Sequence, residues 1–206
     1  MTAVTVASFD AWMERCLITI QKQGGTAYEF AGFTETVDVD LGDKDIEGIP
    51  LVNGGRVAKW NPEADTTVSF DCYPVEIATT TGVANAAATG ICDMWAGSYD
   101  TANPLSINNS RTRDKHRLSI LWTEDSAAAS GDGAVTNGKR GLRLAFVDGF
   151  ITSMKPSFTD GILKFAVSFK TTPYDKTGSA NVLFESVDNV GTLTALSAYT
   201  TSNKWR

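Results

Sequence analysis

The residues with the clearest chemical potential are a group of carboxylates in the first quarter of the chain. The segment from Glu35 to Glu47 reads ETVDVDLGDKDIE and has a net charge of −5, in a chain whose net charge is −6. Outside this segment, 18 acidic residues meet 17 basic ones, so the negative charge is a local feature. A concentrated anionic surface attracts cations or basic protein surfaces and repels nucleic acid.

Calcium binding and acid–base catalysis are the first chemistries that these carboxylates suggest. A helix–loop–helix calcium site needs an oxygen ligand where Gly42 stands, a glycine where Asp43 stands and an acid where Ile49 stands, so the spacing fails. Glycoside hydrolysis needs one carboxylic acid of raised pKa in a cleft, which a row of acids on one strand face does not offer. We therefore expect no metal site, no cofactor and no catalytic residue, with weak cation binding left open.

The histidine and cysteine residues also lack the patterns of a metal site or a catalytic site. The single histidine, His116, lies in the basic run RTRDKHR without the Cys or His partners of a zinc site or the motif of a nucleophile elbow. We interpret it as a surface histidine at the start of a strand. Cys16, Cys72 and Cys92 are odd in number and widely spaced, which indicates reduced thiols rather than a disulfide framework. The chain is expected not to be an enzyme.

Bulk composition narrows the class of protein further. A length of 206 residues with 42% hydrophobic residues suits one domain with a real core. An isoelectric point near 4.8 argues against general binding of duplex DNA. Apolar runs are short, so neither a membrane span nor a secretory signal is expected.

The acidic segment itself follows a strand pattern. Val37 and Val39 alternate with Asp38 and Asp40, which gives one apolar face and one anionic face. The stretch Gly48–Gly55 (GIPLVNGG) is expected to be a loop, because its proline and glycines interrupt a regular ladder.

Two hairpins are expected from alternating segments that turn residues join: Arg56–Trp60 with Thr66–Tyr73, and Gly149–Phe158 with Leu163–Thr171. The second turn contains Asp160-Gly161, a dipeptide that favours tight hairpin turns.

An alanine-rich stripe predicts one packing helix over 81–96. Residues 124–140 are small and polar and are expected to form a mobile surface loop. Residues 1–15 and 175–206 are expected to be arms that flank a main domain at 16–174.

The order of these parts resembles a known family. An early hairpin leads to the acidic strand, a Gly/Pro loop, GGRVAKWNPEADTTVSFDCYPVEI, one helix, a long loop and GFITSMKPSFTDGILKFAVSFKTTPYD. In layout and texture, from Cys16 to Tyr174, the chain resembles the major tail tube protein of long-tailed bacteriophages and related archaeal viruses. The resemblance implies a mainly β subunit, an antiparallel β-sandwich or barrel-like fold with one flanking α-helix. It also implies six copies in a ring, whose inner sheets join into one barrel, and rings that stack into a tube.

The resemblance assigns roles to residues of the acidic segment. Asp38 and Asp40 would face the lumen and keep viral DNA from sticking. The loop at 41–55 would reach the next ring with its acids and apolar residues, Asp43, Asp45, Glu47, Pro50 and Leu51. Contacts between subunits would come from Arg56, from the basic stretch and from the near-terminal tryptophan: Arg111, Arg113, Lys115, Arg117 and Trp205. The basic stretch can equally be a solvated run of charge.

The resemblance also implies partners and a location. The partners would be further copies of the chain, tape-measure and tail-terminator or initiator proteins, and viral DNA that passes without specific binding, with no membrane. The location would be a virion tail assembled in the host cytoplasm. Two alternatives stay open: another self-assembling virion protein, such as a decoration or tail-terminator protein, and a β-sandwich module that binds carbohydrate or cations.

Overall fold

The computed structural model describes residues 15–25, 27–29, 34–60, 63–73 and 114–206, and this part consists of β-strands and connections without a helix. The helix expected at 81–96 and the expected N-terminal arm, apart from Arg15, lie outside the described residues. In chain order the strands are β1 Arg15–Lys22, β2 Ala27–Glu29, β3 Thr34–Asp40, β4 Ile46–Pro50, β5 Arg56–Trp60, β6 Thr66–Cys72, β7 His116–Thr123, β8 Gly141–Thr159, β9 Ile162–Thr171 and β10 Val182–Val187.

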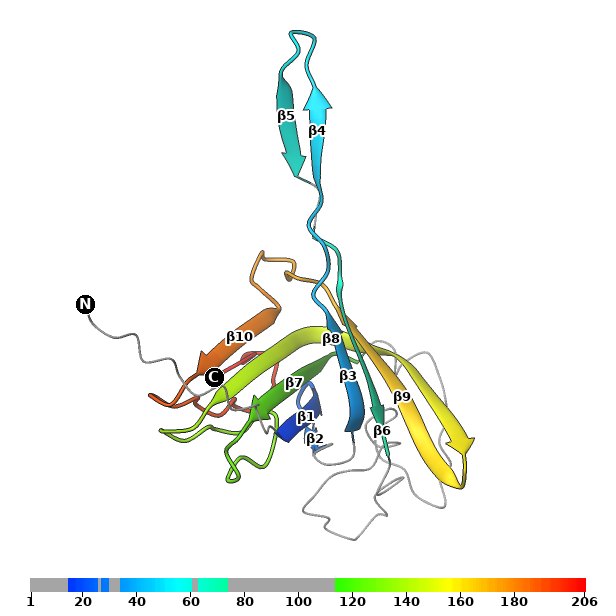
Figure 1. The fold of residues 1–206 in the computed structure, drawn as a ribbon, viewed down its shortest axis with the longest axis vertical. Coiled ribbons are helices and arrows are strands. Elements are labelled where there is room, and N and C mark those ends of the chain that lie inside the picture. The colour runs from blue at the N-terminus through cyan, green and yellow to red at the C-terminus, as the bar shows by residue number, and fades with distance from the viewer. Residues whose placement is uncertain (1–14, 26, 30–33, 61–62, 74–113) are drawn as a thin grey trace, which may run out of the picture.

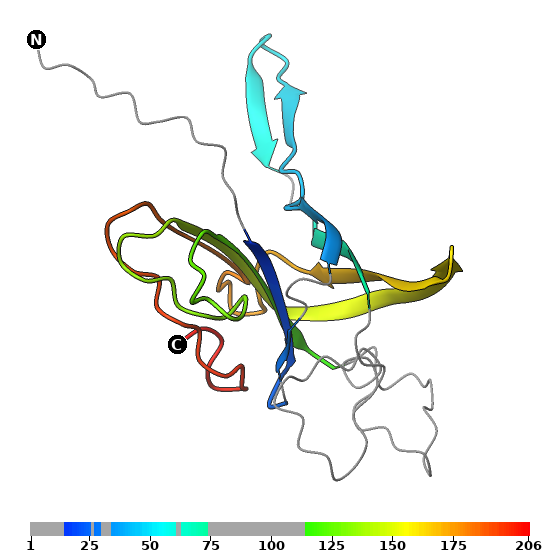
Figure 2. The same cartoon turned by 60° about the horizontal axis from the view of Figure 1, so that its bottom comes forward.

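One antiparallel sheet holds eight of these strands and curves into a half-barrel (Figure 1, Figure 2). Its order is β2-β1-β7-β8-β9-β6-β3, and β10 also pairs with β8. The long strand β8 links two halves, because residues 141–149 pair with β7 and residues 150–159 pair with β9. At the junction Asp148 has a φ of 53°, and a Cβ on Gly149 would lie 2.1 Å from the Phe169 ring. Glycine therefore lets this ring pack directly on the β8 backbone.

The main core lies between the two halves. We call β1, β2, β7, β10 and residues 141–149 of β8 the buried half, and β3, β6, β9 and residues 150–159 of β8 the four-stranded half. Ile18, Ile120 and Phe146 of the buried half share one cluster with Phe70 and Phe169 of the four-stranded half. Strand β6 contributes one face to this core. Its residues alternate strictly between buried and half-buried, so one face packs on the core and the other stays polar.

The second face of the buried half is covered by segments that the sequence suggested would be loose. Val135, from the expected mobile loop at 124–140, is fully buried in a smaller cluster with Leu17, Leu121 and Leu193. The expected C-terminal arm at 175–206 likewise folds onto its own subunit, since it supplies β10 and the buried Tyr199. Both expectations underestimated packing, because scattered apolar residues in polar segments suffice to cover a sheet face.

The connection between β3 and β6 is a projecting two-stranded arm (Figure 1). Strand β5 pairs with β4, from Ile46 opposite Trp60 to Pro50 opposite Arg56, while β6 pairs with β3 and β9. The expected hairpin between Arg56–Trp60 and Thr66–Tyr73 is therefore wrong, and so is the expectation that the proline and glycines block a ladder before residue 55. Pro50 closes β4 in a two-stranded ribbon, where a proline at a strand end is tolerated.

The hairpin predicted around Asp160-Gly161 is confirmed. Strands β8 and β9 pair as far as Thr159 opposite Ile162, and both turn residues have positive φ, 54° and 80°. This combination is the tight turn that Asp-Gly favours. The hairpin places Asp160 at the end of the four-stranded half opposite the arm (Figure 1).

Candidate assembly surfaces

One face of the four-stranded half is polar and open to solvent. The register aligns its side chains in rows that cross all four strands. One row runs Asp38, Ser69, Ser168 and Ser153, and the next runs Thr36, Asp71, Ala166 and Lys155. The alternation predicted for the acidic strand is confirmed, since Asp38 and Asp40 are exposed while Val37 and Val39 pack on the core.

The charges on this polar face divide into paired and remaining ones. Toward the end of β6 away from the arm, Lys164 lies 3.1 Å from Asp71, and near the arm Lys170 lies 3.1 Å from Asp65. Asp38 and Asp40 on β3 and Lys155 on β8 are exposed and form no ion pair among the residues that the structure describes. The remaining charges thus lie on the two outer strands, acids on one and a base on the other.

The arm is the second exposed surface. It carries the apolar side chains Ile46, Ile49, Leu51, Val52 and Val57, and Val52 at the turn is fully exposed. Of the predicted loop residues, Glu47 forms a salt bridge of 3.4 Å with Lys59 across the two strands. Asp43 and Asp45 are exposed in the neck that leads into the arm. A two-stranded ribbon without a core is marginally stable alone, so its apolar residues call for a partner surface.

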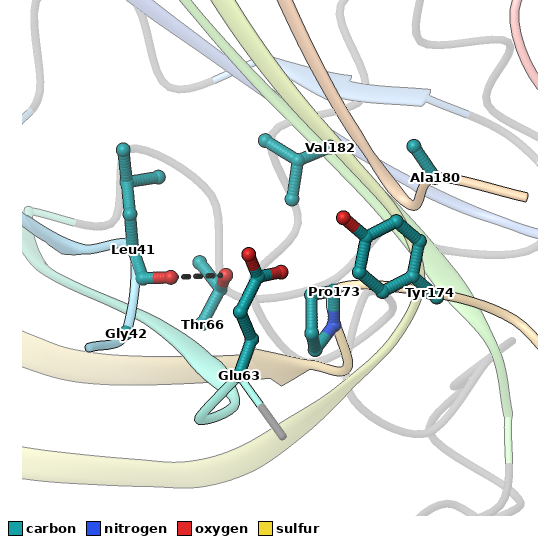
Figure 3. Close-up of a pocket in the computed structure, with 8 residues that line it drawn as sticks. All are labelled: Leu41, Gly42, Glu63, Thr66, Pro173, Tyr174, Ala180 and Val182. Atoms are coloured by element: carbon teal, nitrogen blue, oxygen red, sulfur yellow. Dashed lines mark hydrogen bonds between the residues drawn. The ribbon is translucent and has the colours of Figure 1, made fainter. Parts of the chain in front are cut away.

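A pocket of about 330 Å³ opens where the arm leaves the sheet. Figure 3 shows Leu41 and Glu63 facing Tyr174 and Val182 across it, and the Thr66 hydroxyl donates a hydrogen bond of 3.2 Å to the Leu41 carbonyl. Glycine at position 42 lets the two chain segments of the neck approach closely, because a Cβ there would lie 2.5 Å from the Ala64 carbonyl oxygen. The pocket lining combines apolar side chains with the hydroxyl groups of Thr66 and Tyr174 and the carboxylate of Glu63, and these residues form no catalytic pair.

The residues of the basic stretch that was predicted to contact a neighbouring subunit differ in their surroundings. Arg111 and Arg113 lie outside the described residues. Lys115 is half exposed and forms an ion pair of 3.3 Å with Asp148. Arg117, however, is only 1% exposed, so its assignment as a subunit contact is wrong. His116 is also buried, not at the surface as expected, and its Nδ1 lies 2.9 Å from the Asp114 carbonyl oxygen.

Arg117 instead holds the far ends of the chain together. Its guanidinium donates to the Asp132 carboxylate at 2.7 Å, to the Gln21 side chain at 3.2 Å and to the Lys204 carbonyl at 3.0 Å. The guanidinium carbon also lies 5.9 Å from the centre of the Tyr199 ring. This forked donor set links β1, the loop after β7 and the C-terminal segment from two nitrogens of one rigid plane, a geometry that a lysine does not offer.

A second network fixes the bend in β8. The Tyr199 hydroxyl donates to Asp148 at 2.7 Å, and Lys204 lies 3.0 Å from Asp148 and 2.7 Å from Asp175. Burial opposes ionisation of Asp148, but the hydrogen bonds from Tyr199, Lys204 and Lys115 outweigh it and hold the pKa of Asp148 below its ordinary value. The Lys204 hydrogen bond likewise lowers the pKa of Asp175.

The remaining predicted contacts have local roles. Arg56 is exposed on β5, and Pro50 is opposite it on β4. Trp205 is half buried, and its backbone carbonyl accepts a hydrogen bond of 2.9 Å from Ser197. Its anchoring of a neighbouring subunit stays a prediction.

The described part of the chain contains neither a group of metal ligands nor a membrane-spanning helix. No group of three His, Cys, Asp or Glu side chains there is placed to hold a metal ion. None of its segments is a helix of sufficient length and apolarity to cross a membrane.

Comparisons with known proteins find similarity only at the level of structure. No family model and no curated protein matches the chain. The anti-feeding prophage cap, a tube-terminating cap, is similar with a TM-score of 0.44 and 7% identity over 91% of this chain and 97% of that chain. A sheath/tube terminator of an extracellular contractile injection system has a TM-score of 0.44 and 11% identity, over 87% and 99%. An Hcp protein has a TM-score of 0.37 and 10% identity, over 86% and 99%. At these scores the likeness is one of general outline.

Proposed function

We propose that the chain is a structural protein that assembles into rings, six copies each, which stack into the tube of a virus tail and conduct DNA. The observation that carries this proposal is the pair of open strand edges on the four-stranded half. Strand β3 pairs only with β6, and residues 150–159 of β8 pair only with β9, within the described part of the chain. Open edges are a hazard that closure into a barrel removes.

The polar face gives such a barrel a suitable bore. It exposes hydroxyl groups and balanced ion pairs rather than a surplus of lysine or arginine. Duplex DNA carries about one negative charge per 1.7 Å of its axis, so a basic bore would bind it and hold it. A bore lined by Ser69, Ser168 and Ser153 with Asp38 and Asp40 leaves the duplex hydrated and free to move.

The arm is suited to contact the next ring. It leaves the four-stranded half at one end only and exposes its apolar side chains over its whole length. A contact between two different surfaces of the same chain is heterologous, and such contacts propagate into stacks. An arm that every ring could offer to the next supports the tube role over that of a single cap.

The test is electron microscopy of the purified full chain, with and without a preformed ring seed. We expect six-membered rings and hollow stacks from the natural sequence. A variant in which a short Gly-Ser linker replaces residues 46–60 is expected to form single rings without stacks, and its unchanged circular dichroism would show that the body still folds. A chain that stays monomeric at high concentration with seeds present contradicts the proposal. Rings of the natural sequence that never stack favour a tail-terminator role.

A further inference from the structure

We propose that neighbouring copies in the ring are joined by an ion-pair seam, in which Lys155 of one copy meets Asp38 and Asp40 of the next. This inference rests on the proposed ring and identifies the residues that select its closure. It starts from three charges on the polar face that, among the residues described, remain after Asp71 pairs with Lys164 and Asp65 pairs with Lys170. The two acids lie on one outer strand of the four-stranded half and the base lies on the other.

Strand directions allow this contact. Strand β3 runs toward the arm, since Asp40 precedes the neck. Strand β8 runs away from it, because Phe150 shares the row of Asp40 and Thr159 lies at the far end. Two copies that stand side by side in the same orientation therefore present β3 of one and β8 of the other as antiparallel edges. The strand pairs in the described part of the subunit are all antiparallel as well.

The three charges also share one face. Successive pairings align Lys155 with Ala166, Asp71 and Thr36, so Lys155 stands on the same side of the sheet as Asp38 and Asp40. Lys155 lies one row from Asp38, and diagonal neighbours on adjacent strands come within about 7–8 Å, which long side chains span. The register stagger that closes a barrel shifts the rows along the seam by further residues. Because the two acids are two residues apart on β3, Lys155 keeps one of them within reach over a shift of about two residues.

Opposite charge across the seam explains both attraction and selectivity. Each edge repels a copy of itself, because β3 meeting β3 would bring four carboxylates together. The attractive arrangement is heterologous and leads around a ring. Asp38, Asp40 and Lys155 together give each copy a net charge of about one negative unit on the polar face, and the seam leaves this sum unchanged.

Two complementary variants test the seam. The first carries Asp38→Lys with Asp40→Lys, which makes both of its edges basic, and the second carries Lys155→Glu, which makes both of its edges acidic. Each alone is expected to lose rings, with at least about a tenfold fall in ring fraction by light scattering at equal protein concentration. Mixed in equal amounts, they are expected to regain rings in which the two variants alternate, and native mass spectrometry should show a composition of one to one.

The mixture also controls for folding, since misfolded chains would not rescue each other. Matched controls change exposed charges off the four-stranded half: Lys176→Glu and Asp188→Lys are expected to assemble as the natural sequence does. Rings formed by either seam variant alone, or a mixture without rings, would overturn the seam while leaving the proposed function intact. If the natural sequence forms no rings, the proposed function fails and the seam fails with it.

Discussion

Single buried charged residues hold together segments that are far apart in the sequence. Arg143 is fully buried, donates to the Glu185 carboxylate at 3.0 Å and to the Thr194 carbonyl at 2.9 Å, and also contacts the carbonyls of Gly131 and Gly133. These contacts tie the loop after β7 and the C-terminal segment to the sheet.

We expect Arg143→Ala to lower the free energy of unfolding by about 3–5 kcal/mol, because Glu185 and several carbonyls would lose a buried partner. Urea unfolding of the monomer measures this. The matched control is Lys59→Ala, which removes the exposed partner of Glu47 and should cost less than about 1 kcal/mol. Equal losses in the two variants would show that the buried network contributes little.

Asp148 gives the molecule an acid-sensitive bend. The folded pKa of Asp148 lies below its unfolded value near 3.9, so its contribution to stability is complete above that pH and is lost as the pH falls through the folded pKa. We expect Asp148→Asn, which tolerates the positive φ, to cost about 1–3 kcal/mol at pH 7. The variant should also lose less stability than the natural sequence between pH 5 and pH 2.5. Parallel denaturation curves at the two pH values would contradict this account.

Cys72 illustrates chemistry that burial suppresses. Burial, with a smaller effect of the neighbouring Asp71 carboxylate, raises the pKa of its thiol to about 12. We expect iodoacetamide at pH 8 to leave Cys72 unmodified in the native protein and to modify it in urea, as peptide mass spectrometry can show. Rapid native labelling of Cys72 would mean that strand β6 opens readily.

At the scale of elements, the sequence predicted those features that depend on neighbours along the chain. Alternation in β3 and β6 and the turn at Asp160-Gly161 are local patterns, and all three are confirmed. The pairing of β5 with β4 was missed, because turn residues between Arg56–Trp60 and Thr66–Tyr73 suggested a hairpin and Pro50 suggested an interruption. Arg117 looked solvated because its partners, Gln21 and Asp132, are far from it in sequence. In the candidate assembly surface, the sequence predicted the exposed face of Asp38 and Asp40. The proposed role of Lys155 could not be predicted, because it depends on the register of four strands.

The arm offers a matched pair of glycines, Gly42 in its neck and Gly54 in the turn at its tip. Gly42 and Gly54 have nearly equal φ values, 80° and 81°, but a Cβ would meet the Ala64 carbonyl only at Gly42. We therefore expect Gly42→Ala to speed hydrogen exchange at the neck, including the amide of Ala64 that donates to Asp43. Gly54→Ala should affect only the turn, at a cost of about 1–2 kcal/mol for its backbone conformation. Indistinguishable exchange patterns would show that the close approach at the neck has no consequence.

At the scale of the whole molecule, the proposed tube requires that the polar face release the DNA that it would enclose. We expect Ser168→Lys, which places one more cation per copy at the centre of this face, to make assembled tubes retain duplex DNA. Retention should weaken steeply as salt rises, because bound phosphates release counterions. Co-sedimentation of DNA with tubes measures this effect, and Ser179→Lys, on an exposed loop outside the sheet, is the control. Equal retention by both variants would show that this face does not line the bore.

Strand β8 would have a mechanical consequence for the proposed tube. Its 19 residues pass without interruption from the buried half into the four-stranded half, held by β7 and β10 at one end and by β9 at the other. Tension along such a strand loads many ladder hydrogen bonds at once, in shear, rather than opening them one after another. A pull on the barrel wall would thus be shared with the core of every subunit, and the clamp of Tyr199 and Lys204 on Asp148 would set how far each subunit can flex.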